Sequence, residues 1–123
     1  MVKEKSEMAL QMDAKDVVLS CVSAINREDF DAARQYVSED MSFTGVLGSR
    51  RGRDAYFKEM EKIRLKYDVK KIFVEGSDVC LFYDLAVSGT TVFVCAWYQV
   101  REGKISTLRV VFDPRPLLAE KAA

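Results

Sequence analysis

The first half of the chain places apolar side chains three or four residues apart, which is the spacing of amphipathic helices. Asp13 is a good helix N-cap, and the apolar stripe that follows it ends near Asn26. We predict a shorter second helix after Glu28 or Asp29 and a third after Arg53. The inward stripes of these three helices are Ala14, Val17, Val18, Cys21, Val22 and Ile25, then Phe30, Ala33, Tyr36 and Val37, then Tyr56, Phe57, Met60, Ile63 and Tyr67.

The second half is rich in β-branched and aromatic residues instead, and it predicts four consecutive strands. The segments between them are short enough for hairpins, so the strands form an antiparallel meander. Before the third helix we expect a short extended segment and then a glycine-bracketed loop. Because the helices precede the strands, the order favours an α+β domain. The predicted strands are 69–75, 79–87, 91–100 and 104–112, and the extended segment and loop are 41–46 and 45–52.

The length of 123 residues fits one domain with a single hydrophobic core. We predict a flexible lead-in at 1–12, the domain at 13–116 and a tail at 117–123. Pro114 and Pro116 are expected to stop the last strand, because proline cannot donate to a strand ladder.

The strand 79–87 is apolar on both of its faces. Leu81, Tyr83 and Leu85 point one way, and Phe82 and Ala86 point the other. A sheet with one wet face would alternate apolar and polar residues. We therefore expect one face to cover the helices and the other to be buried by a second copy of the sheet, in a twofold dimer.

Charge and hydropathy narrow the range of partners. Nineteen basic and nineteen acidic residues cancel, so the net charge supports neither a nucleic acid nor an anionic membrane as partner. No stretch approaches the roughly 20 apolar residues of a membrane span, and the N-terminus lacks the apolar core of a secretory signal. Three widely spaced cysteines suggest reduced thiols, and we expect a cytoplasmic protein.

The chain contains no histidine. This absence removes histidine-based acid/base catalysis, Ser-His and Cys-His nucleophiles and imidazole zinc sites. Any catalysis would need carboxylates, tyrosines, arginine or lysine. We predict neither a metal nor a cofactor.

Three segments in this order resemble the nuclear transport factor 2-like superfamily, which includes the SnoaL-like and ketosteroid-isomerase-like proteins. They are AINREDFDAARQYVSEDMSF (24–43), GRDAYFKEM (52–60) and VREGKISTLRVVFDP (100–114). The resemblance covers about residues 14–114. It implies a cystatin-like curved antiparallel sheet, packed on three N-terminal helices to form a cone with an internal pocket. It does not imply one chemistry, because the superfamily contains cyclases, isomerases, epoxide hydrolases, dehydratases and non-catalytic domains.

The catalytic positions that the resemblance implies are mostly replaced. A ketosteroid-isomerase-like site would place its base at Gly45, its tyrosine at Cys21 and its late aspartate at Ala96. An epoxide-hydrolase-like site would keep Asp84, but Phe82 stands at the place of its arginine partner. The SnoaL-like cyclases use a histidine, which this chain lacks.

Asp84 is the first candidate for catalysis. The family comparison assigns it to the pocket face with Phe82, where burial would raise the pKa of its carboxyl. Alternatively, Asp84 pairs with Arg109 or Arg53, or meets water at the end of its strand. Tyr98 is a second candidate, since its hydroxyl could reach a ligand, although such a tyrosine is more often part of the core.

Two larger sets complete these expectations. Pocket lining is predicted for Tyr36, Phe43, Tyr56, Met60, Phe82, Leu108, Val110 and Phe112. A dimer interface is predicted for Leu81, Tyr83, Leu85, Trp97 and Arg109. The sequence therefore predicts a domain that binds a small hydrophobic molecule, and it leaves open whether acid/base catalysis of the isomerase, cyclase or hydrolase type takes place. The alternative is a non-catalytic dimerisation or protein-interaction module.

Overall fold

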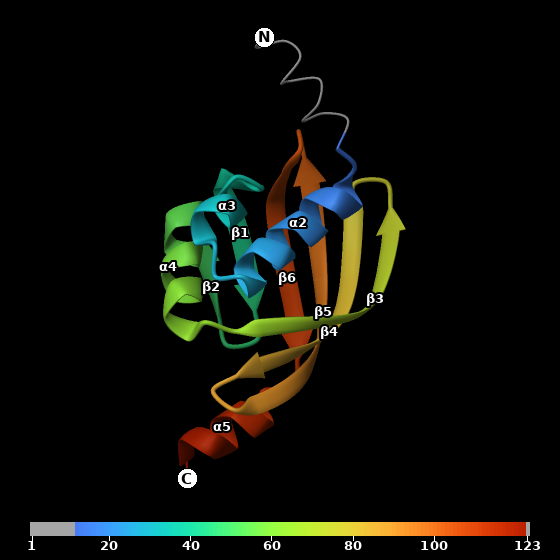
Figure 1. Ribbon diagram of the computed structural model, residues 1–123. Helices are drawn as coiled ribbons and strands as arrows, with labels where there is room; N and C mark the ends of the chain where they lie inside the picture. Colours follow the sequence, from blue (N-terminus) through green and yellow to red (C-terminus); the bar gives the residue numbers. More distant parts are fainter. Residues whose placement is uncertain (1–11, 123) are drawn as a thin grey trace.

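A computed structural model describes residues 12–122 of the chain (Figure 1). Most of the predicted lead-in at 1–12 and the last residue of the predicted tail lie outside the described residues. The helices are α2 (Ala14–Asn26), α3 (Phe30–Arg34), α4 (Arg53–Ile63) and α5 (Arg115–Ala122). The strands are β1 (Val37–Gly45), β2 (Gly48–Arg51), β3 (Lys66–Glu75), β4 (Asp78–Val87), β5 (Thr90–Arg101) and β6 (Lys104–Phe112).

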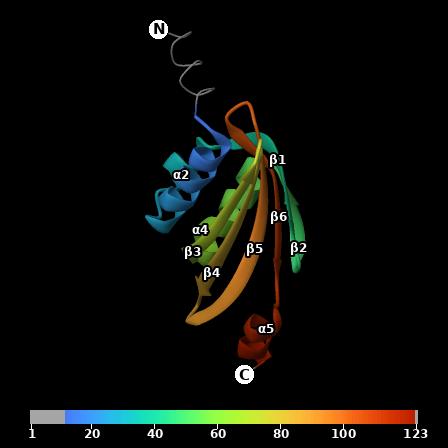
Figure 2. The same cartoon turned by 90° about the vertical axis from the view of Figure 1, so that its right-hand side faces the viewer.

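The six strands form one curved sheet in the order β2-β1-β6-β5-β4-β3. The predicted antiparallel meander is present as β3 to β6. Seen along its edge, the sheet bends around α2 and α4, which lie on its concave side (Figure 2). The predicted α+β cone, with a curved sheet packed on three N-terminal helices, is confirmed, although β1 and β2 precede α4 in the chain.

Two strands extend this sheet beyond the meander. β1 starts earlier than the predicted extended segment and runs parallel to β6, with Phe43 opposite Leu108. β2 forms an antiparallel hairpin with β1 where the sequence predicted a loop. All four residues of β2 are exposed, so no apolar alternation marked it as a strand. The sheet is therefore mixed, and not purely antiparallel.

The three helices begin where the sequence predicts them, but α3 and α4 end earlier than their predicted apolar stripes. Val37 and Tyr67, assigned to those stripes, lie instead in β1 and β3. The Asp13 carboxylate accepts a hydrogen bond of 2.8 Å from the backbone N–H of Asp16 and so caps α2. Asp29 caps α3 in the same way, with 3.2 Å to the N–H of Ala32. Within residues 12–122, no helix combines the length and apolarity that crossing a membrane requires.

The strands β4 and β5 alternate strictly between a buried and a partly exposed face. Leu81, Tyr83 and Leu85 lie within the core of the single chain, with exposed fractions of 0%, 3% and 8%. They therefore cannot form the dimer interface that the sequence predicted for them. Phe82 and Asp84 lie on the opposite, outer face. The period of two correctly separated the two sets, but it does not say which set faces the helices.

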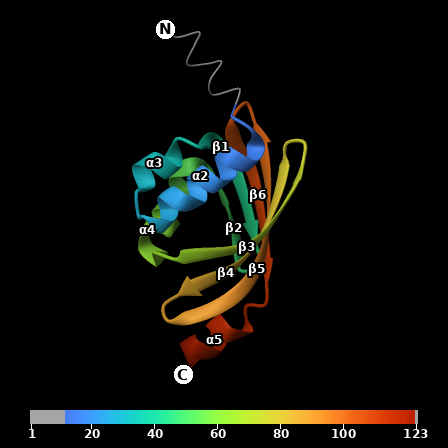
Figure 3. The same cartoon turned by 45° about the vertical axis from the view of Figure 1, so that its right-hand side comes forward.

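The C-terminal segment also departs from expectation. Instead of an irregular tail, it forms α5, whose first turn follows Pro114. Figure 3 shows α5 beneath the end of the sheet where β4 and β5 meet. Leu117 packs against the core, so this helix helps to close the open end of the cone.

One side chain ties the end of α2 to the start of β3. The Asn26 carboxamide accepts a hydrogen bond from the backbone N–H of Tyr67 (2.8 Å) and donates one to the Tyr67 carbonyl (3.0 Å). Both bonds are partly buried and join residues 41 positions apart. Asn26 thus fixes the first helix against an edge strand of the sheet.

We expect Asn26→Ala to lower the free energy of unfolding by about 1–3 kcal/mol, because the backbone groups of Tyr67 lose partners in a partly buried site. Urea denaturation followed by circular dichroism measures the change. The matched control is Ser23→Ala, which removes an exposed hydrogen bond to Arg27 and should change stability by less than about 0.5 kcal/mol. Equal effects for the two variants would contradict this role of Asn26.

Candidate functional site

A cavity of about 580 Å³ opens between the concave face of the sheet, α4 and α5. This volume is in the range of small-molecule sites. Strand residues form one wall, helix α4 forms another, and the β1–β2 hairpin and α5 border the opening. The apolar lining consists of Phe43, Val46, Leu47, Met60, Ile63, Leu65, Leu85, Val87, Leu108, Val110, Phe112, Leu117 and Leu118.

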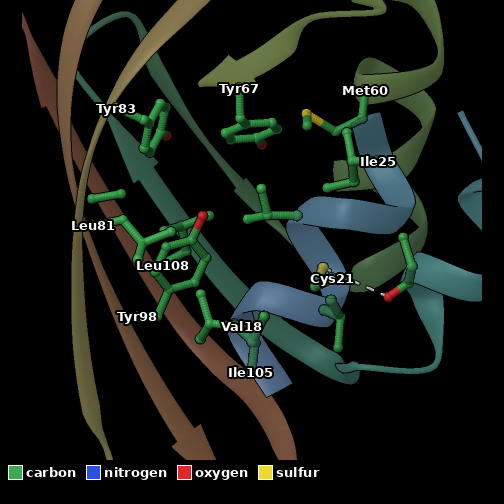
Figure 4. Close-up of a cluster of buried hydrophobic side chains, with 14 of the residues drawn as sticks. Val18, Cys21, Ile25, Met60, Tyr67, Leu81, Tyr83, Tyr98, Ile105 and Leu108 are labelled. Atoms are coloured by element: carbon green, nitrogen blue, oxygen red, sulfur yellow. Dashed lines mark hydrogen bonds between the residues drawn. The ribbon is translucent and has the colours of Figure 1, made fainter. Parts of the chain in front are cut away.

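Three tyrosines contribute polar atoms to the buried part of this lining. Tyr56 comes from α4, Tyr67 from β3 and Tyr83 from β4, and they are 6%, 9% and 3% exposed. The rings of Tyr67 and Tyr83 are tilted against each other, with their centroids 4.8 Å apart. In Figure 4, Tyr67 and Tyr83 project from the strands toward the interior that Met60 and Ile25 border. The cavity is thus apolar with a small group of hydroxyls on its inner wall.

These tyrosines belong to a larger buried cluster that also contains Tyr98 and Cys21. The Tyr83 hydroxyl is hydrogen-bonded to that of Tyr98, and the Tyr56 hydroxyl to that of Tyr67. This interaction lowers the pKa of Tyr83 and raises that of Tyr98, which adds to the effect of burial on Tyr98.

Burial raises the pKa of all four hydroxyls above the ordinary tyrosine value. Electrostatic repulsion between neighbouring members of the cluster adds to this effect. Burial likewise raises the pKa of the Cys21 thiol, to about 12. At neutral pH the cluster is therefore uncharged and offers hydrogen bonds, not ionised groups.

Charged side chains border the cavity only at its exposed end. Arg50, Glu59 and Lys62 are the charged members of the described lining. The Arg50 guanidinium lies 3.8 Å from the Glu59 carboxylate, and both side chains are more than a third exposed. Glu59 is the one carboxylate in the described lining, and it faces solvent at the rim.

Asp84, the leading sequence-based candidate for catalysis, lies outside the cavity. Its side chain is 38% exposed on the outer face of the sheet and lies 3.7 Å from Lys70. In the sheet it stands opposite Phe93 of β5 and Asp68 of β3. The pocket assignment is corrected, because the family comparison selected the wrong face of β4. Its partner is Lys70 and neither of the two arginines considered from the sequence.

The other predicted site residues divide into three that lie outside the cavity lining and six that lie within it. Tyr98 lies in the core beside the cavity lining, with its hydroxyl bonded to Tyr83. Tyr36 is half-buried against the core, and Phe82 lies on the outer face, so neither lines the cavity. The structure places the remaining six predicted residues in the lining, namely Phe43, Tyr56, Met60, Leu108, Val110 and Phe112.

Sequence reasoning missed two kinds of lining residue. Tyr83 and Leu85 were assigned to an interface because the parity of β4 was inverted. Leu117 and Leu118 were assigned to a tail. Two adjacent leucines after the prolines are a signal that this segment packs against apolar surface. The described residues contain no cluster of three or more potential metal ligands.

Comparison with known proteins fits this arrangement. A model of the SnoaL-like domain family matches residues 18–108. The chain belongs to the SnoaL-like domain family. No curated protein shows a significant match to this SnoaL-like domain.

Solved structures share the fold. An NTF2-like protein of unknown function from Cytophaga hutchinsonii is 42% identical, with 88% of this chain and 96% of that chain covered and a TM-score of 0.86. An LEH-like epoxide hydrolase from M. tuberculosis is 21% identical, with 89% and 95% covered and a TM-score of 0.72. TerC, co-crystallised with polyporic acid, is 15% identical, with 89% and 98% covered and a TM-score of 0.78. At 21% and 15% identity, the last two show the fold alone.

We expect the SnoaL-like domain to lose stability as the pH rises above about 10. Unfolded tyrosines ionise near pH 10, whereas the folded cluster keeps its protons, so the unfolded state binds fewer protons there. The slope is up to about 1.4 kcal/mol per pH unit for each buried tyrosine. Urea denaturation between pH 8 and 11 measures it. An unchanged stability across that range would contradict burial of the four hydroxyls.

Proposed function

We propose that the domain binds one small apolar molecule that carries a neutral hydrogen-bond acceptor. The observation that carries this proposal is the cavity of about 580 Å³, whose largely apolar lining includes Tyr56, Tyr67 and Tyr83. An apolar body would supply most of the affinity by leaving water. The acceptor, such as a ketone, quinone or ether oxygen, would fix its orientation.

Tyr83 is the donor best suited to that acceptor. It lines the cavity on the strand wall, whereas its neighbour Tyr98 does not. Because burial keeps the hydroxyl neutral, donation would not depend on pH below about 10. A buried hydroxyl without a partner is unfavourable, so a ligand with an acceptor would be preferred over a hydrocarbon of the same shape.

Binding without turnover fits the described residues better than acid/base catalysis. Catalysis of the isomerase, cyclase or hydrolase type needs a proton acceptor close to the bound molecule. Asp84 lies on the outer face, and Glu59 lies at the rim beside Arg50. The tyrosines of the inner wall have a raised pKa, so they stay protonated at neutral pH and cannot act as a base.

A matched pair of probes tests this proposal. We expect 2-acetylnaphthalene to bind more tightly than 2-ethylnaphthalene, by about 2- to 12-fold, because only the ketone accepts a hydrogen bond. Isothermal titration calorimetry measures both dissociation constants. Tyr83→Phe should abolish the preference for the ketone and leave the affinity for 2-ethylnaphthalene unchanged, whereas the control Tyr36→Phe should alter neither.

A cavity-filling variant tests the place of binding independently of the hydrogen bond to the ligand. Val110→Trp would occupy the space and should weaken both probes by at least about tenfold while the protein stays folded. Retention of binding in Val110→Trp would contradict the cavity as the site. Equal binding of the two probes to the unchanged protein would contradict the role of the tyrosines.

A second candidate function, self-association, is favoured by the outer face of the sheet. Phe73, Phe93, Trp97 and Val111 are exposed there by 52%, 59%, 41% and 62%. Phe82 lies between Phe73 and Phe93 and packs edge-on against both. Its ring centroid is 5.8 Å from that of Phe73 and 6.0 Å from that of Phe93. We propose that a second copy covers this aromatic face, since contiguous exposed apolar surface marks interaction sites.

We expect Phe93→Glu to shift the protein to a monomer, because the charge would be buried at the interface without a partner. Light scattering coupled to gel filtration over a 100-fold range of concentration measures the mass. The control is Leu47→Glu, which changes an equally exposed residue at the cavity mouth. A monomeric unchanged protein at the highest concentration would contradict the dimer.

A further inference from the structure

Two cysteines on the outer face of the sheet lie in contact with each other. Cys80 belongs to β4 and Cys95 to β5, and their sulfur atoms are 3.5 Å apart. Both side chains are partly exposed, and neither takes part in the cavity. The third cysteine, Cys21, is buried on the other side of the sheet, where its thiol points to the Ala33 carbonyl at 3.7 Å.

We propose that Cys80 and Cys95 form a reversible dithiol–disulfide modification site, which a small disulfide such as oxidised glutathione converts to a cross-strand bond. The two sulfurs are already in contact, and the third thiol of the chain, Cys21, lies on the other side of the sheet. Closing the bond requires them to approach from 3.5 Å to about 2.05 Å.

The position of the pair in the sheet argues for a labile bond over a permanent one. Cys80 stands opposite Trp97, and Cys95 stands opposite Phe82, so the cysteines are diagonal neighbours on adjacent strands. Diagonal neighbours in antiparallel strands have Cα atoms about 7–8 Å apart, beyond the roughly 4.4–6.8 Å that a disulfide usually spans, so closing the bond requires the two strands to shift toward each other. Such a bond stores strain and is reduced easily, as regulatory disulfides are.

The exchange proceeds in two steps that balance. The thiolate of one cysteine attacks a sulfur of oxidised glutathione, which forms a mixed disulfide and releases one glutathione thiolate. The second cysteine then attacks the protein sulfur of that mixed disulfide and expels the other glutathione. In total, the two thiols lose two electrons and two protons, and one oxidised glutathione becomes two molecules of the reduced form.

The surroundings of the pair slow this reaction at neutral pH. Burial, together with the hydrogen bond to Cys95, raises the pKa of the Cys80 thiol to about 11. Since the thiolate is the attacking species, the reaction should be run in mildly alkaline buffer, at about pH 8.5. Cys21 is far better shielded, so it serves as an internal control within the same chain.

The single tryptophan of the chain provides an optical readout. Trp97 stands directly opposite Cys80, and its indole N–H donates to the Asp78 carboxylate at 2.9 Å. Arg109 lies over its ring, 5.9 Å from the centroid. A disulfide beside the indole quenches its fluorescence, so formation of the bond can be followed in real time.

The test uses the full chain, diluted until light scattering shows a monomer, because a second copy on the aromatic face would cover both cysteines. The chain is incubated with oxidised glutathione at pH 8.5 and examined by intact mass and peptide mapping. We expect the mass to fall by about 2 Da, a peptide that joins Cys80 to Cys95, and quenched Trp97 fluorescence. Dithiothreitol should restore the starting mass and fluorescence. Cys80→Ser and Cys95→Ser should each retain glutathione on the remaining cysteine, at least about tenfold more than the unchanged protein.

Cys21→Ser is the matched control and should behave like the unchanged protein. The proposal would be overturned by glutathione retained on both cysteines, by disulfides between chains, or by a link that includes Cys21. It would equally be overturned if both thiols stayed reduced while a model peptide thiol in the same tube was oxidised. Peptide mapping of the unchanged protein decides the question even if a serine variant fails to fold.

Discussion

The strict alternation of the paired strands β4 and β5 is the constraint on which the rest of the structure depends. Successive side chains of a strand must point to opposite faces, so one register decides what is core and what is surface. Here that register places Tyr83 and Leu85 on the cavity side and Phe82 and Asp84 outside. The same rule puts the one contact between two thiols on the outer face. The cavity, the aromatic surface and the dithiol are thus three results of a single pairing.

Much of the fold could be predicted because its local signals are strong. The caps Asp13 and Asp29, and the hairpin turns between the last four strands, lie where the sequence indicated. The choice of face could not be predicted, since β4 is apolar on both sides and a period of two has no preferred direction. The resemblance to a family supplied that choice and supplied it wrongly for Asp84. The β2 hairpin was missed because an exposed edge strand carries no apolar pattern.

All but one of the exposed large apolar side chains of the described residues fall into two separate groups, the exception being Val74 near the end of β3. Val46, Leu47, Ile63 and Leu118 surround the opening of the cavity, whereas Phe73, Phe93, Trp97 and Val111 lie on the outer face of the sheet. An opening lined with apolar groups suits the entry of an apolar molecule, and an exposed aromatic surface suits a protein partner. The two groups therefore fit a domain that binds a ligand in its cavity and a second copy on its outer face. Because the two surfaces do not overlap, both can be occupied at once.

The parallel pairing of β1 with β6 has a consequence for how the chain reaches this state. Val37 pairs with Ile105, so β1, whose other neighbour β2 follows it directly, meets β6 only after nearly the whole domain has been synthesised. Contacts between segments so distant along the chain slow the search for the native topology. On the ribosome, the amino-terminal helices and the β1–β2 hairpin must therefore wait, with apolar surface uncovered, until the last strand has left the exit tunnel.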